Sequence, residues 1–262
     1  MALRLITWNL NGLDPTEIDL RTEAACLRML LRPVLPDVVL LQEVVRRSWH
    51  AHLKHHFSAA GFTPWPADPT DTPSEYFSVV LVRAPLPTEA GGVEPFPGSH
   101  MGRCLVWARL GWSGRSLLVC TGHLESGRQA SVERTRQLAR IVDVLRAHGR
   151  DGDAAIFGGD TNLRRAEEPR VDGLDTLDDA WIASGAIPSL RATWPAPGWD
   201  PSPGWDPSPR RAPGARFDRV LSCGLDVQAF SLVGGTAPGL RGPPSDHLGI
   251  EVCFEPRGHR PA

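Results

Sequence analysis

The feature that most constrains the fold of this chain is a series of short apolar runs, each of strand length and each ending in polar residues. Residues 3–8 alternate and end at Asn9, and residues 38–41 form an apolar run before Gln42 and Glu43. Residues 104–110 and 117–121 are typical of a hairpin around a glycine-containing turn. Further strands are expected at 77–82, 154–157, 220–221, 227–233 and 248–254.

Helical periodicity is limited to three segments. Residues 131–145 carry Leu138, Ile141 and Leu145 on one stripe. Residues 18–32 show helical apolar spacing (Leu20, Ala24, Leu27, Leu31), and residues 45–60 also favour a helix. Many strands in hairpins and few helices favour two packed sheets flanked by helices over a regular βαβ alternation. No glycine-rich nucleotide fingerprint is present, which excludes the nucleotide-binding folds that depend on one.

Composition limits the class of protein. With 262 residues of which 41% are apolar, the chain can build one large core, and we expect a single domain over residues 1–262. No run approaches the ~20 apolar residues of a membrane span, so we expect no membrane contact and cytoplasmic residence. A net charge of −2 argues against non-specific binding along duplex DNA, which needs many phosphate contacts, but it allows an enzyme that binds a few phosphates locally.

One segment is of low complexity. Residues 197–202 are repeated at once as residues 203–208, and their prolines forbid regular structure. We expect a surface loop insertion at about 195–213. Neutral expansion of this loop and contact with substrate remain equal alternatives.

Two carboxylates at the ends of apolar runs are candidate metal ligands. Glu43 ends one run, and Asp246 precedes the last one in a Ser-Asp-His motif. Mg²⁺ prefers few carboxylates, several waters and substrate phosphate. Taken singly, Glu43 is more typical of a helix cap or a salt bridge, and Asp246 is also compatible with a simple turn.

His247 is the natural group to donate to a phosphate oxygen as charge develops. For that role it must be oriented and cationic, which requires a buried carboxylate partner, and Asp218 is the candidate. The alternative is that Asp218 pairs with Arg216 or Arg219.

Asp160 and Asn162 follow a short apolar run and suit the positioning of a nucleophilic water. Two glycines precede Asp160, and we expect them to let the backbone approach a ligand closely. The alternative for this pair is an Asx turn at a strand end. His123 also ends a strand and could be a neutral surface residue, whereas Arg164 could clamp phosphate or face solvent.

The order and context of these motifs resemble the endonuclease/exonuclease/phosphatase superfamily from residue 7 to about residue 254. Within it, the chain resembles the 5′-tyrosyl-DNA phosphodiesterases. The segments that carry this resemblance are residues 7–14, 123–126, 133–138, 159–164, 179–181, 193–194, 216–219 and 245–247. Gly122 and Leu248 depart from that pattern, as does the repeated loop, and these departures leave the substrate open.

The resemblance implies a four-layer α/β sandwich of two mainly antiparallel sheets with helices outside. It also implies a role for each matching residue. The metal ligands would be Glu43 and Asp246, with Mg²⁺ as the cofactor and Mn²⁺ as a substitute. The catalytic residues would be Asp160, Asn162, His247, Asp218, Asn9 and His123. The substrate-binding residues would be Arg164, Arg103, Tyr76 and Trp194.

The activity implied is hydrolysis of 5′-phosphotyrosyl–DNA bonds to leave a 5′-phosphate end. The partners would be DNA ends, expected to be single-stranded, that carry a phosphotyrosyl or other aryl phosphodiester group, and the protein would be a monomer. A nuclease or a small-phosphoester phosphatase of the same superfamily is the first alternative. A non-catalytic binding module is the second.

Overall fold

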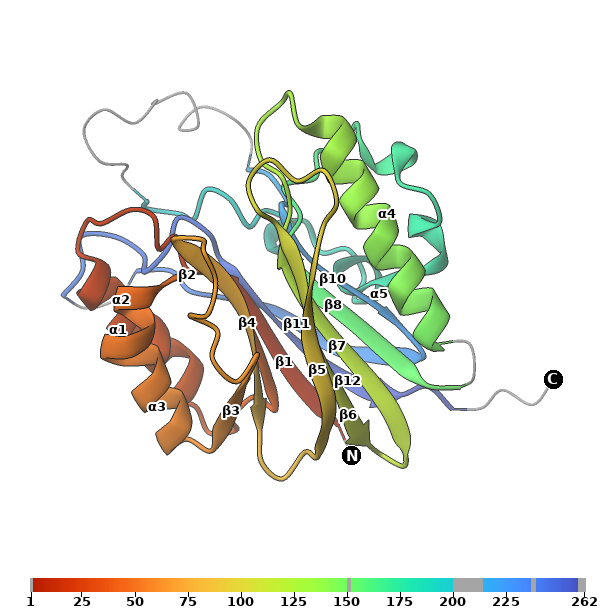
Figure 1. Ribbon diagram of the computed structural model, residues 1–262, viewed down its shortest axis with the longest axis horizontal. Coiled ribbons are helices and arrows are strands. Elements are labelled where there is room, and N and C mark those ends of the chain that lie inside the picture. The colour runs from red at the N-terminus through yellow and green to blue at the C-terminus, as the bar shows by residue number, and fades with distance from the viewer. Residues whose placement is uncertain (1, 150–151, 200–213, 237–238, 259–262) are drawn as a thin grey trace.

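Two six-stranded sheets lie face to face, with helices on both outer surfaces (Figure 1). The computed structural model describes residues 2–149, 152–199, 214–236 and 239–258. The first sheet has the order β11 (Leu225–Val233), β12 (Gly249–Pro256), β1 (Leu3–Asn9), β2 (Val38–Val45), β4 (Tyr76–Arg83) and β3 (Phe62–Trp65). The second has the order β5 (Thr88–Pro95), β6 (Cys104–Trp112), β7 (Arg115–His123), β8 (Ala154–Asp160), β10 (Asp218–Cys223) and β9 (Asp178–Asp179).

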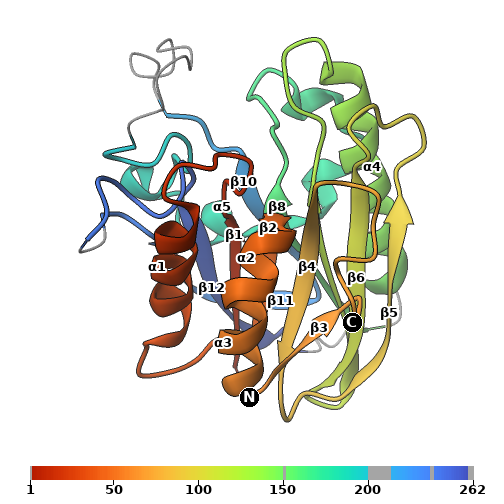
Figure 2. The same ribbon diagram turned by 60° about the vertical axis from the view of Figure 1, so that its left-hand side comes forward.

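The helices form the two outer layers. On one side lie α1 (Ile18–Leu30), α2 (Arg46–Ser48), the π-helical turn η1 (Trp49–Leu53) and α3 (Lys54–Ala59), and on the other lies α4 (Ser131–His148) (Figures 1 and 2). The short α5 (Ala180–Ala183) packs against strands of both sheets, β10 and β11, and its Ala180 belongs to the core between the sheets. Within the described residues, the 3₁₀ turns η3 (Glu168–Arg170), η4 (Leu174–Thr176) and η5 (Pro188–Leu190) lie in the connections. The expected four-layer α/β sandwich is thus confirmed.

Each sheet has one parallel pair at its centre, and its other pairs are antiparallel. β1 pairs with β2 in the first sheet, and β7 pairs with β8 in the second. Carboxyl ends of parallel strands reach the same edge of a sheet. The two central pairs therefore bring four strand ends, with their polar residues, to one edge of the sandwich.

Three apolar clusters fill the spaces between the layers. One lies between the sheets and includes Leu5, Leu40 and Val119. A second packs α1 and α3 onto the first sheet, and a third packs α4 onto the second. The stripe expected on α4 is confirmed, since Leu138, Ile141, Val142 and Leu145 are fully buried.

The helix expected at 18–32 is present, but the face predicted from its leucines is wrong. Leu20, Leu27 and Leu31 are exposed, whereas α1 buries Ile18, Arg21, Thr22, Ala25, Cys26 and Met29. Arg21 is accepted on this buried face because its guanidinium donates to backbone carbonyls that include Pro244 O at 3.1 Å.

Every strand expected from the sequence is present, and β3, β5 and the short β9 are additional. No helix within the described ranges is long and apolar enough to cross a membrane. Most of the predicted loop insertion at 195–213 lies outside the described residues.

Candidate active site

The ends of the four central strands converge on one cavity of about 1140 Å³. Asn9 and Gln42 form the last register pair between β1 and β2, and His123 and Asp160 are partners at the ends of β7 and β8. Ten of the twelve predicted site residues line this cavity: Glu43, Tyr76, Arg103, His123, Asp160, Asn162, Arg164, Trp194, Asp246 and His247. The other two, Asn9 and Asp218, are buried and hydrogen-bonded to residues that line it.

The glycine pair before Asp160 serves strand packing, which corrects the expectation that it faces a ligand. A Cβ on Gly159 would lie 2.2 Å from the carbonyl oxygen of Gly122 in β7. A Cβ on Gly158 would lie 2.8 Å from Leu40 Cδ1 of the facing sheet. The glycines therefore let β8 approach both its neighbour and the opposite sheet, which fixes the position of Asp160.

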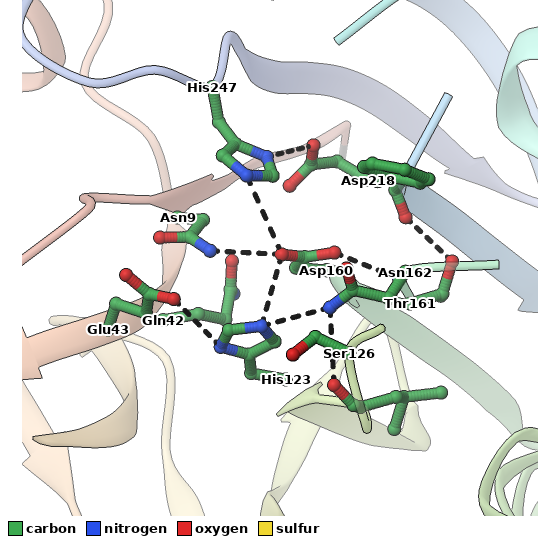
Figure 3. A network of polar contacts seen from close by, with 12 residues as sticks. Asn9, Gln42, Glu43, His123, Ser126, Asp160, Thr161, Asn162, Asp218 and His247 are labelled. Carbon is green, nitrogen blue, oxygen red and sulfur yellow. Dashed lines mark hydrogen bonds and ion pairs between the residues drawn. The ribbon is translucent and has the colours of Figure 1, made fainter. Parts of the chain in front are cut away.

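Asp160 is the centre of the polar network (Figure 3). Its Oδ2 accepts a hydrogen bond from Asn9 Nδ2 at 3.0 Å and lies 3.2 Å from His123 Nε2. Its Oδ1 accepts the backbone N–H of Asn162 at 2.9 Å. Burial alone would raise the pKa of Asp160, but the imidazoles of His123 and His247 and these hydrogen bonds hold it below its usual range.

His247 is oriented by Asp218, as predicted from the sequence. Its Nδ1 lies 2.7 Å from Asp218 Oδ2, and its Nε2 points into the site, 3.7 Å from Asp160 Oδ2 (Figure 3). Burial would lower the pKa of His247, but the carboxylates of Asp218, Asp246 and Asp160 outweigh burial and raise it well above the usual value. His247 is therefore an imidazolium that donates to Asp218 and presents a second N–H to the cavity.

The alternative that Asp218 pairs with Arg216 or Arg219 is wrong. Arg216 forms an ion pair with Asp179 at 2.6 Å, and Arg219 pairs with Glu168 and Asp179.

Glu43 lies at an irregularity within β2. The pairing of β2 with β4 shifts between Leu41 and Val44, and Glu43 adopts a left-handed conformation with φ of 51°. Together the shift and this conformation turn the carboxylate towards the cavity. Burial and the nearby carboxylates of Asp246 and Asp160 raise the pKa of Glu43 to about 7.

Asp246 is held by Trp194. The indole Nε1 of Trp194 donates to Asp246 Oδ2 at 3.0 Å, and its ring lies 5.4 Å from that of Phe217. The Ser245 hydroxyl donates to the Asn9 carbonyl at 2.6 Å, which ties the Ser-Asp-His loop to the end of β1. Trp194 therefore positions a carboxylate as well as lining the cavity.

His123 is buried, so the surface alternative for it is wrong. Its Nδ1 faces Glu43 Oε1 at 3.5 Å, and its Nε2 lies 3.0 Å from Asn162 Nδ2. Burial, opposed by Asp160 but reinforced by Arg103 and His247, lowers the pKa of His123 to about 3. It is therefore neutral at physiological pH.

The outer wall of the cavity is cationic and aromatic. Arg103 is 6% exposed, and its guanidinium lies 5.2 Å from the centre of the Tyr76 ring. Its Nε and Nη1 have no hydrogen-bond partner among the described residues. Arg164, held by the Gly127 carbonyl at 3.1 Å, lies on the same wall. Two guanidinium groups are thus available for an anionic ligand.

Two sets of side chains could hold a metal ion. Within the described ranges, Asp160, Asp218 and His247 offer ligand atoms that all lie within 4.8 Å of one another. In that set, however, His247 and Asp218 are already bonded to each other at 2.7 Å. Glu43 and Asp246 form the second set and have carboxylate oxygens facing the cavity.

Several residues of the site carried no role in the sequence interpretation. Gln42 is fully buried, and its Nε2 donates to Thr7 Oγ1 at 3.0 Å and to Thr121 Oγ1 at 2.8 Å, which links the two sheets beneath the site. Its position directly before Glu43 was the available signal. The hydroxyl of Thr193 accepts the Asp218 N–H at 3.2 Å, and the signal for Thr193 was its place in the resembling segment 193–194.

Comparison with known proteins places this geometry in a family. A model described as "Endonuclease/Exonuclease/phosphatase family" matches residues 6–247. Tyrosyl-DNA phosphodiesterase 2 of Mus musculus is 32% identical over 255 residues, which cover 95% of this chain and 65% of that protein. The Homo sapiens protein of the same name is 31% identical over 218 residues, which cover 82% of this chain and 56% of that protein. The chain thus spans less than two thirds of these relatives.

Solved structures agree with the sequence comparison. The structure described as D. rerio TDP2 complexed with single strand DNA product has a TM-score of 0.83 and 29% identity, covering 97% of this chain and 99% of that one. The catalytic domain of human Nocturnin, at 16% identity and a TM-score of 0.71, shares the fold. The resemblance inferred from the motifs is confirmed, and the chain belongs to the Endonuclease/Exonuclease/phosphatase family.

Proposed function

We propose that this chain is a magnesium-dependent phosphodiesterase that hydrolyses 5′-phosphotyrosyl–DNA bonds and leaves a 5′-phosphate end. One observation carries the proposal. The buried carboxylate of Asp160 and the imidazolium of His247 line the same cavity, with Asp160 Oδ2 3.7 Å from His247 Nε2. The names of the relatives, and the single strand DNA product in one structural neighbour, support the choice of substrate.

A divalent cation fits the donor set. Glu43, Asp246 and Asp160 place three carboxylates around one end of the cavity, and their mutual repulsion contributes to the raised pKa of Glu43. Glu43 and Asp246 would hold the ion, because oxygen ligands that leave room for water and phosphate suit Mg²⁺, and also Mn²⁺. When bound, the cation supplies charge stabilisation at the phosphate oxygens.

The chain's own residues account for the rest of the reaction. Asp160 and Asn162 hold a water in line with the scissile phosphorus–oxygen bond, and the Nε2–H of His247 donates to a non-bridging oxygen. Asp218 keeps His247 protonated and oriented. The leaving group is a tyrosine phenol with a pKa of about 10, so the bond breaks with little acid assistance.

The outer wall favours an aryl phosphodiester at a DNA end. Arg103 lies on the ring of Tyr76 with two nitrogens free of hydrogen bonds to the described residues, and Arg164 offers a second cation. These groups suit the phosphates and the ring of a single-stranded, 5′-linked substrate. The monomeric state and the cytoplasmic location remain predictions.

The experiment that tests the proposal offers the purified protein a single-stranded oligonucleotide with a 5′-phosphotyrosyl end, with Mg²⁺ and with EDTA. The unmodified strand and an abasic duplex serve as controls. We expect magnesium-dependent release of a 5′-phosphate end from the modified strand alone. Cleavage of a control with the tyrosyl end left intact would overturn the substrate and favour the nuclease alternative.

A further inference from the structure

Arg134 is a buried guanidinium that the reaction proposed above does not use. It lies on α4, within the resembling segment 133–138, and it does not line the cavity. Its side chain is fully buried and forms a two-point ion pair with Glu167, with Nε 3.1 Å from Oε2 and Nη2 2.7 Å from Oε1. Its Nη1 donates to the carbonyls of Glu125 at 2.7 Å and Gly127 at 3.0 Å. One side chain therefore joins α4 to the connections that follow β7 and β8.

Glu167 links Arg134 to Arg164 on the cavity wall. Its Oε2 also accepts the backbone N–H of Arg164 at 2.9 Å, and its own N–H donates to the Arg164 carbonyl at 2.8 Å. The Arg164 side chain donates, at 3.1 Å, to the same Gly127 carbonyl that accepts from Arg134. Burial would raise the pKa of Glu167, but the hydrogen bonds from Arg134 and Arg164 lower it, so the carboxylate is charged. The backbone and the guanidinium of Arg164 both depend on groups that Arg134 holds.

The same helix holds Arg103 through Glu125. The Glu125 N–H donates to Gln137 Oε1 at 2.9 Å, and the Glu125 carbonyl accepts from Arg134, so two residues of α4 fix its backbone. The carboxylate of Glu125 is buried and accepts the Ser99 hydroxyl at 2.7 Å. Ser99 Oγ in turn accepts the Arg103 N–H at 2.7 Å. A continuous series of contacts therefore connects Arg134 to the second guanidinium of the wall.

We propose that Arg134 is a positioning residue for substrate binding, which holds Arg164 and Arg103 in place without touching the substrate. The inference rests on the proposed function, because it takes these two guanidinium groups as contacts for the phosphates of a DNA end. Both belong to connections rather than strands, so strand pairing alone does not fix them. The planar fork of an arginine can hold a carboxylate and two carbonyls at once, whereas the ammonium of a lysine is a point charge. The competing interpretation is that Arg134 only stabilises the fold.

The test compares Arg134→Lys with wild type and with Arg140→Lys. Arg140 is the matched control, because it also lies on α4 and pairs with a glutamate, Glu94 at 2.8 Å, but at the exposed surface. KM and kcat are measured on the 5′-phosphotyrosyl single strand in Mg²⁺. The Kd is measured for the 5′-phosphorylated strand, which is the product and is not turned over. The melting temperature of each protein reports the fold separately.

We expect Arg134→Lys to raise KM and the product Kd about tenfold, the loss typical of one weakened charge-assisted hydrogen bond. Its kcat should change by less than about twofold, because the wall binds substrate and transition state alike. Arg140→Lys should change none of these quantities. A lower melting temperature of Arg134→Lys with wild-type KM and Kd would assign Arg134 to the fold alone and overturn the proposal.

A double-mutant cycle with Arg164→Ala tests the route of the effect. The rise in Kd caused by Arg134→Lys should be smaller in the Arg164→Ala background than in wild type, and fully additive effects would contradict the proposal. If lysine prevents folding, Arg134→Met combined with Glu167→Leu replaces it, because this pair leaves no unpaired charge buried and should still raise the Kd.

The two readouts separate this inference from the proposed function. A wild type that binds the product strand but does not hydrolyse the phosphotyrosyl strand would refute the proposed function, and the comparison of Kd would still decide the role of Arg134. A wild type that does both, with an equal Kd in Arg134→Lys, would refute the inference alone. Absence of strand binding by wild type would refute both.

Discussion

At the scale of single residues, Asp160 sets the geometry of the site, because one oxygen of its carboxylate contacts groups from both sheets. Asn9 reaches it from the first sheet at 3.0 Å, and His123 reaches it from the second at 3.2 Å. The same residue is the candidate for positioning water. Structural and chemical roles therefore overlap in one side chain, and a substitution must be chosen to separate them.

Asp160→Asn keeps the shape of the side chain and removes its charge. We expect the rate of phosphotyrosyl hydrolysis to fall by about 10²–10⁴-fold, the range typical for loss of a positioned base. The measurement is kcat on the phosphotyrosyl oligonucleotide, and Asp143→Asn on the exposed face of α4 is the control. Activity of Asp160→Asn equal to that of the control would contradict the mechanism.

Glu43→Gln should stabilise the metal-free protein while abolishing its activity. The pKa of Glu43 is about 7 in the fold, against an ordinary value of 4.5, because of burial and the neighbouring carboxylates. Below about pH 4.5 the carboxyl is protonated in both the folded and the unfolded state, so it does not change the free energy of unfolding. As the pH rises from 4.5 through 7, its ionisation lowers the free energy of unfolding. We expect Glu43→Gln to gain on the order of 1–3 kcal/mol at pH 8 and nothing at pH 4.

The measurement for Glu43 is chemical unfolding in EDTA at both pH values. Arg103 and His247 partly offset the repulsion, which places the gain within a range rather than at a single figure. An equal effect of the substitution at pH 4 and pH 8 would show that the ionisation of Glu43 is not its cause.

At the scale of elements, the sequence predicted the central strands because their apolar runs and polar ends are continuous. It missed β3 and β5, since Pro64 lies inside the first, and Gly91 and Gly92 inside the second, and such residues argue against strands. Both are edge strands, where the sheet tolerates these residues. On α1, leucine periodicity indicated the wrong face, because Arg21 and Thr22 are buried through hydrogen bonds that periodicity does not register.

The candidate site was predictable for a related reason. The motifs end strands, and parallel pairing brings strand ends together, so ten predicted residues share one cavity. Contacts that depend on the facing sheet were not predictable, and the bridge from Gln42 to Thr121 is the main example. The position of Trp194 against Asp246 likewise depends on a connection without regular structure.

The contact between β7 and β8 gives a prediction at this scale. In Gly159→Ala the new methyl group would meet the Gly122 carbonyl at 2.2 Å, so the strands must separate. His123 and Asp160 are register partners at the end of this pair and would move apart. We expect lower thermal stability and a lower kcat. Gly92→Ala on the edge strand β5 is the control, because the atoms nearest to its methyl group belong to the Trp107 side chain, at 3.2 Å, and not to backbone.

The test for this pair measures melting temperature and kcat for both variants. If Gly159→Ala retained wild-type kcat, the spacing of β7 and β8 would not control the geometry of the site.

At the scale of the whole molecule, the site depends on both sheets at once. Asn9 and Glu43 come from the first sheet, and His123, Asp160 and Asp218 come from the second. Gln42 ties the sheets together directly beneath them through the hydroxyls of Thr7 and Thr121. The cluster of residues between the sheets is the largest apolar core, so the packing that stabilises the fold also aligns the two halves of the site.

This dependence predicts that activity and global structure are lost together. In urea, the decline of hydrolysis and the loss of tryptophan fluorescence should share one midpoint, because neither sheet alone can hold the five residues. A cation bound between carboxylates of the folded state should raise the free energy of unfolding, by about 2.7 kcal/mol at one hundred times its dissociation constant, and the urea midpoint should rise with it. Loss of activity at a lower urea concentration than the fluorescence change would instead place the site on a locally unfolding segment. A urea midpoint that does not change with Mg²⁺ would argue against Glu43 and Asp246 as ligands of the ion.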